Sequence, residues 1–160
     1  MIPEQPDHIT VFERGPYLQT ALICETVLTE QDGVLSIIRV IDRVIVSATG
    51  PDAPETMPPF GANLILLIML KSGPAQGNYP VRISLEQPSG ISREVGLTTA
   101  MLEGEDRGAN LINRMAIQFV EQGLYWFSIR FGDAKQLLTK VPLRVMYVRS
   151  GGPLQVGPPR

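Results

Sequence analysis

The stretch GLYWFSIRFGDAKQLLTKVPLRVMYV, from Gly123 to Val148, decides the fold class. Apolar residues fall at every second position on both sides of Gly132 and Asp133, and a period of two is the pattern of a half-buried strand. The glycine and aspartate between the two runs supply turn chemistry, so the stretch predicts a β-hairpin. The alternating positions are Tyr125, Phe127, Ile129 and Phe131, then Leu137, Thr139, Val141, Leu143, Val145 and Tyr147.

The same pattern predicts further strands upstream, separated by turn sequences such as EQDG and QPSG. The expected strands are Leu18 to Leu28, Val34 to Ala48, Ala62 to Lys71, Tyr79 to Glu86, Ile91 to Thr99, and Leu111 to Val120. Isoleucine spacing between Leu35 and Ile45 also fits a helix, but the density of β-branched residues favours a strand. About eight short strands without long helical segments predict an all-β protein, an antiparallel β-sandwich of immunoglobulin-like or related Greek-key arrangement.

The strands define one domain with a segment at each end. We expect an N-terminal arm at 1–17, the sandwich at 18–149, and a flexible tail at 150–160, because proline and glycine in that tail disfavour sheet pairing. The four prolines between Thr49 and Gly61 predict a long loop inside the domain.

The motif Gly-x-Tyr-x-Phe at Gly123 to Phe127, followed by a hairpin and a last strand, resembles the end of an immunoglobulin-like domain. That resemblance implies that the Tyr125 hydroxyl ties a corner of the sandwich. It concerns architecture only, because the Cys-Trp-Cys spacing of true immunoglobulin domains is absent.

The segment LICETVLTEQDGVLSIIRVIDRV resembles the start of an uncharacterised family of short bacterial proteins. The shared features are a strand, the turn at Asp32 and Gly33, an apolar strand containing Leu35, and the pair Asp42 and Arg43. Isoleucine and valine stand here where the family would have a glycine-rich, aromatic patch before the aspartate. The resemblance implies a bacterial, cytoplasmic, β-rich domain of unknown function, and it implies no catalytic residue.

Composition limits the classes of function. The chain has 160 residues, 44% of them hydrophobic, with a formal net charge of −2, so it has a sizeable core and no basic stripe for nucleic acid. Its most apolar run, Ala62 to Leu70, is too short to cross a bilayer as a helix, which argues against a membrane protein. The single cysteine, Cys24, is expected in the core, and the N-terminus lacks a secretory signal pattern, which favours the cytoplasm.

Catalytic signatures are missing from the sequence. The one histidine, His8, lies in a polar, proline-flanked segment that is a poor place for a fixed catalytic group. No nucleotide-binding glycine motif or nucleophile elbow occurs, and a lone cysteine excludes a zinc cluster within one chain. We therefore expect no cofactor and no enzymatic activity, and an enzyme of unrecognised type is only the third hypothesis.

One charged constellation stands out between Gly104 and Gly108. Glu103, Glu105 and Asp106 are weak candidates for holding a calcium ion, and Arg107 is a candidate for contacting an anionic ligand. Such a module is the second hypothesis, and it would gain from Asp32, Asp52 and Asp133 if their loops clustered. The simpler interpretation is a solvated turn between two strands, with Arg107 paired to a neighbouring carboxylate.

Two other features are ambiguous. Asp42 lies between apolar residues, so it either faces inward or marks a break in a strand, and we expect Arg39 or Arg43 to pair with it in a structural role. Trp126 falls on the face opposite Tyr125 and Phe127, where it is either an exposed contact residue or covered by a loop.

The sequence predicts assembly. Val34 to Val46 and Ala62 to Leu70 are apolar on both faces, which a sandwich with one solvated face per sheet does not require. Either the proline loop or a second copy should cover the excess, with Ile37 and Leu66 as contact candidates. The leading hypothesis is a non-catalytic binding or assembly module that forms a homodimer, with a further protein partner possible.

Overall fold

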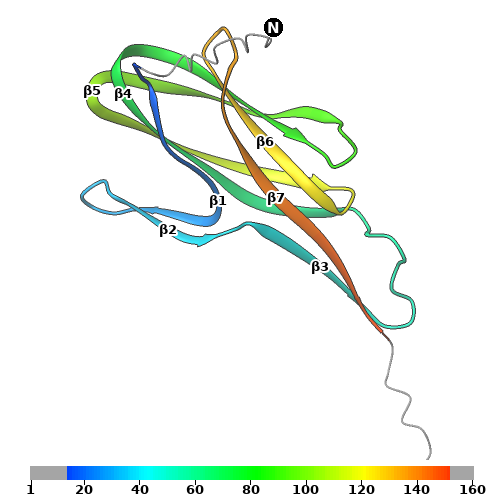
Figure 1. The fold of residues 1–160 in the computed structure, drawn as a ribbon. Coiled ribbons are helices and arrows are strands. Elements are labelled where there is room, and N and C mark those ends of the chain that lie inside the picture. The colour runs from blue at the N-terminus through cyan, green and yellow to red at the C-terminus, as the bar shows by residue number, and fades with distance from the viewer. Residues whose placement is uncertain (1–13, 152–160) are drawn as a thin grey trace, which may run out of the picture.

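The computed structural model describes residues 14–151, and these form an all-β domain (Figure 1). No described residue belongs to a helix long and apolar enough to cross a membrane. His8 and most of the expected arm and tail lie outside the described residues. The strands are β1 (Tyr17–Thr29), β2 (Leu35–Val40), β3 (Arg43–Thr49), β4 (Phe60–Glu86), β5 (Ser92–Phe119), β6 (Gly123–Phe131) and β7 (Gln136–Ser150).

The strands form one mixed sheet in the order β2-β1-β4-β6-β7-β3, with β5 paired to β4 outside this path. The predicted hairpin is confirmed as β6 and β7, which pair antiparallel. The expectation of a wholly antiparallel arrangement is wrong, because β3 runs parallel to β7 from Arg43 beside Arg144 to Thr49 beside Ser150. A parallel neighbour is possible here because a long stretch of chain separates β3 from β7.

The described residues form seven strands and not eight, because two pairs of expected strands are continuous and one expected strand is divided in two. The runs on either side of residues 72–78 form the single strand β4, and those on either side of 100–110 form β5. The two long strands stay paired from Phe60 beside Phe119 to Glu86 beside Ser92, with irregular register around Gly73. The segment Gly104 to Gly108 is therefore a bend inside β5, and the expectation of a turn between two strands is wrong.

The bend gives the sheet two parts. The first half of β4 pairs with β1, and the second half pairs with β6, while β5 follows β4 through both. At the bend, Gly73 and Gly104 have φ of 57° and 89°, a region that favours glycine. Figure 1 shows β4 and β5 curving together through this region.

The inner faces of the two parts share one core. Leu66 and Ile68 from the first half of β4 belong to the same buried cluster as Ile83 and Leu85 from the second half. Alternate residues of a strand point to the same face, so each part contributes every second side chain to this core. Further members from the other strands are Ile23, Ile117, Phe119, Tyr125, Phe127, Ile129, Leu143 and Val145.

A second, smaller cluster lies on the outer face of the first part. Cys24 and Leu67 are completely buried there, although their side chains point away from the main core. The β1–β2 hairpin supplies Val27, Leu35 and Ile37 to this cluster. The apolar side chains on the outer face of β4 are therefore covered by the β1–β2 hairpin. The sequence had suggested that the proline loop or a second copy would cover them.

The chain changes partners between β2 and β3. The Ile41 amide donates to the Ile23 carbonyl of β1, and the next carbonyl, that of Asp42, accepts from the Arg144 amide of β7. One expected strand, Val34 to Ala48, is thus two strands divided at Asp42. The switch carries the chain to the far edge of the sheet, where β3 lies.

Tyr125 ties the start of β6 to the preceding turn. Its ring is completely buried, and its hydroxyl donates to the Glu121 carbonyl over 2.7 Å. The hydroxyl also accepts from the Glu121 amide over 3.2 Å. Phe119 packs edge-on against the same ring at 5.0 Å.

The aromatic core of β6 leads to a first prediction. Phe127→Ala should lower the free energy of unfolding by about 3–5 kcal/mol because it empties an aromatic core site. Tyr125→Phe should cost about 1 kcal/mol, since it keeps the ring and removes only the hydroxyl that bonds to Glu121. Urea unfolding measures both, and a Phe127→Ala midpoint equal to that of the parent would contradict the assigned inward face.

The bend leads to a second prediction. A Cβ at Gly108 would lie 2.5 Å from the Leu70 carbonyl oxygen, so Gly108→Ala should destabilise by about 1–3 kcal/mol through overcrowding. Gly61→Ala is the matched control, because a Cβ there meets nothing within 4 Å. Equal thermal midpoints for the two variants would show that the close pairing at the bend is not required.

Candidate functional site

The acidic bend of β5 is held by local pairs. Arg107 donates to the Glu103 carboxylate over 2.7 Å, and Lys71 donates to the Asp106 carbonyl over 3.2 Å. The hydrogen bond and charge of Glu103 raise the pKa of Arg107. Within residues 14–151, no three histidine, cysteine or acidic side chains gather in a way that could hold a metal ion. The candidate ligands Glu103, Glu105 and Asp106 are therefore not brought together as a cation site.

Asp42 lies at the switch between β2 and β3 with its side chain in solvent. Arg43 donates to both carboxylate oxygens of Asp42 over 3.1 Å, and this pairing lowers the pKa of Asp42. The other arginine considered for this role, Arg39, pairs with Glu25 over 3.1 Å. The backbone of Asp42 fixes the crossing of the chain, while its exposed ion pair adds little to stability.

Trp126 is half-buried on the outer face of the sheet's second part. It lies beside Glu86 on β4, and the Lys140 ammonium sits 5.9 Å from the centre of its ring. Lys140 also pairs with Glu86 over 3.7 Å. The ring is thus neither a fully exposed anchor nor part of the core, because a charged pair from the neighbouring strands partly covers it.

The two apolar contact candidates differ in placement. Ile37 is half-buried in the cluster beneath the β1–β2 hairpin. Leu66 is 0% exposed in the main core, so it cannot contact a partner and its proposed contact role is wrong. Its neighbours Leu64 and Ile68 on the same strand face are also buried. A charge at Leu66 would test core packing and not assembly.

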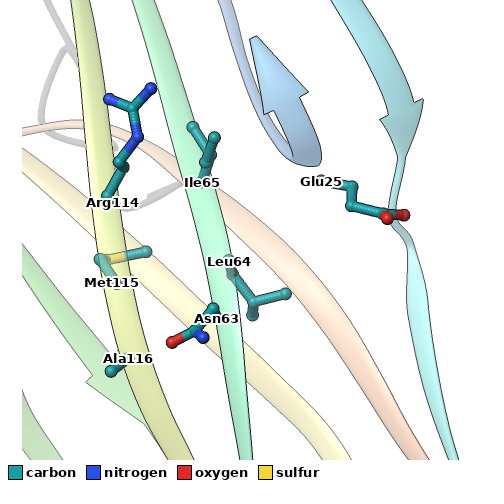
Figure 2. Close-up of a pocket in the computed structure, with 7 residues that line it drawn as sticks. All are labelled: Glu25, Asn63, Leu64, Ile65, Arg114, Met115 and Ala116. Atoms are coloured by element: carbon teal, nitrogen blue, oxygen red, sulfur yellow. The ribbon is translucent and has the colours of Figure 1, made fainter.

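A hollow is lined by residues of β1, β4 and β5 (Figure 2). Its volume is about 450 Å³, and it is lined by Glu25, Asn63, Leu64, Ile65, Arg114, Met115 and Ala116. Figure 2 shows the Glu25 carboxylate directed away from Arg114. Because the two charged groups do not converge on the hollow, it lacks the few converging polar groups that a small-molecule site requires.

An exposed apolar strip on β3 and β7 was not predicted from the sequence. Ile45 is 55% exposed, Met146 38% and Val148 45%, and the parallel register places Ile45 beside Met146. The alternation of both strands carried a signal, since Val44 and Val46 share one face of β3 and Ile45 necessarily lies on the other. Knowing which face is covered required the pairing of β3 with β7.

The chain was also compared with known proteins. No curated protein matches it. The pattern of a family described as "Family of unknown function (DUF6941)" matches residues 19–146, a range that includes the turn at Asp32 and Gly33 and the pair Asp42 and Arg43. The match spans most of the described strands, so the chain belongs to this family of unknown function.

Proposed function

We propose that this chain is a non-catalytic binding or assembly module of a bacterial cytoplasmic protein, and that it associates with a second copy of itself. The observation that carries the proposal is the apolar strip of Ile45, Met146 and Val148, which lies in solvent on regular strands. Contiguous exposed apolar residues are a common mark of a contact surface. Leu66, which the sequence suggested as a contact residue, does not support the proposal because its side chain is in the core.

The arrangement of polar groups supports a role in binding over catalysis. Arg107 pairs with Glu103, Arg43 with Asp42, and Arg82 with Glu94, each on the surface. Burial raises the pKa of the Cys24 thiol, which works against a reactive thiolate. None of these groups forms the pair of nucleophile and base that covalent catalysis requires.

We relate the architecture behind this proposal to an immunoglobulin-like or Greek-key sandwich. The support is the hydrogen bond of Tyr125 to Glu121 and the single core shared by the two halves of β4. Domains of that architecture commonly present sheet faces and edges to partners. The parallel pair of β3 and β7 departs from the antiparallel arrangement expected from the sequence.

Assembly gives a third prediction, on the mass of the protein in solution. At high micromolar concentration the weight-average mass should approach twice the 17.6 kDa of one chain, and it should fall on dilution. Sedimentation equilibrium measures this over a concentration series. A constant mass of one chain at every concentration would contradict the homodimer.

The calcium-binding alternative gives a fourth prediction. Millimolar calcium should leave the melting temperature unchanged, because Glu103 is already paired with Arg107 and the other acidic side chains do not converge with it. A ligand that binds only the native state must raise the melting temperature. A rise of several degrees that disappears in the double variant Glu103→Gln with Asp106→Asn would favour the calcium module.

A further inference from the structure

The free edge of β3 differs from the other free edges among the described strands. Among the described strands, three have no partner along one whole side: β2 and β3 at the two ends of the sheet, and β5 beside β4. An unpaired edge offers backbone N–H and C=O groups to any other strand, and proteins usually block it with bulges, bends or charges. Figure 1 shows β3 on the rim of the molecule, flanked by β7.

Two of these edges are blocked. The short strand β2 contains Arg39 with a φ of 54°, which interrupts its extended backbone. The long strand β5 has an irregular register near Gly73 and again at Ile83. Its sequence also carries several charged side chains, namely Arg93, Glu94, Glu103, Glu105, Asp106, Arg107 and Arg114. Both edges are therefore poor templates for another strand.

The edge of β3 has none of these protections. Its seven residues pair with β7 without a register shift, and Arg43, its first residue, is the single charged side chain in the strand. The edge is roughly 23 Å long at about 3.3 Å per residue. Its outward face presents Ile45, which is 55% exposed.

We infer that β3 forms the dimer interface, with the β3 strands of two copies pairing antiparallel about a two-fold axis at Val46. This inference rests on the proposed function and specifies the surface that it uses. An axis at Val46 brings all seven residues of each strand, Arg43–Thr49, into register. The same patch then serves both copies, so the assembly closes as a dimer.

The side chains of β3 are compatible with this register. Ile45 lies opposite Ser47 of the second copy, and Val44 lies opposite its Ala48. Arg43 lies opposite Thr49, so no like charges face each other across the seam, where they would be destabilising. On the outer face, Met146 and Ile45 of one copy continue into Ser47 and Val148 of the other, because Ser47 pairs with Val148 within each chain.

The contact is short, which sets the expected strength. Stable interfaces bury about 1,200–2,000 Å² in total, and one pair of seven-residue strands with its flanking side chains lies at the low end of that range. We therefore expect a dimer that forms in the micromolar range and dissociates on dilution. Sheet extension supplies main-chain hydrogen bonds, and the apolar strip supplies the specificity.

The test places charges directly opposite each other across the seam. Ile45→Lys with Ser47→Lys sets lysine against lysine at two places, and we expect it to weaken dimerisation at least tenfold. Ile45→Lys with Ser47→Glu sets lysine against glutamate at the same two places, and it should keep the dimer. Both positions are solvent-exposed, so each variant should fold, and circular dichroism checks this.

The matched control adds the same charges to another edge. Leu97→Lys with Thr99→Lys places two lysines at exposed positions on β5, and it should leave the mass distribution of the parent unchanged. Sedimentation equilibrium of the parent and the three double variants decides the question. Pairing through β3 is supported if only the variant Ile45→Lys with Ser47→Lys loses the dimer.

Two results would overturn the inference in different ways. If the dimer persists with the two lysines on β3, or is lost equally with the two lysines on β5, then β3 is not the interface. The proposed assembly function is not contradicted by either result. A parent that stays monomeric at several hundred micromolar removes both the seam and the proposed homodimer.

Discussion

The continuous pairing of β4 with β5 through a bend is the constraint on which the rest of the structure depends. A ladder that runs from Phe60 to Glu86 is too long for one flat layer in a small domain, and the glycines near residues 73 and 104 let it fold over. Once it folds, alternate residues of both halves face one another and exclude water from a single core. The close approach of Gly108 to the Leu70 carbonyl shows how little space the bend leaves.

The branch at β4 determines where the remaining strands lie. Because β5 occupies one side of β4 along its length, β1 and β6 must share the other side, one on each half. The β1–β2 hairpin then covers the outer face of the first half, and β7 extends the second. The crossing at Asp42 takes the chain from the first part to the second, and this leaves β3 with a partner on one side only.

The sequence was sufficient for the all-β class, for the resemblance to a family of unknown function, and for the alternation in the β6–β7 hairpin. Tyr125 and Phe127 face the core as their spacing predicts, because alternation is a local property of a strand. The bend in β5 was mistaken for a turn between strands, since glycines and charges are typical of both and only pairing with β4 distinguishes them. Leu66 was proposed as a contact residue because its strand is apolar on both faces. Its own side chain is buried in the main core, and the β1–β2 hairpin covers its neighbours Ile65 and Leu67 on the opposite face.

Leu66 and Ile45 show why assembly surfaces are difficult to read from sequence. Both are large aliphatic residues in β-branched, apolar strands, yet one is 0% exposed and the other 55%. The difference lies in the number of neighbours that each strand has: β4 is paired on both sides and covered on both faces, whereas β3 ends the sheet. A hydrophobic side chain at the end of a sheet remains in contact with water until another strand arrives, and the backbone beside it offers the hydrogen bonds that such a strand needs. The end of the sheet at β3 is therefore the place where exposed side chains and unpaired backbone favour a partner together.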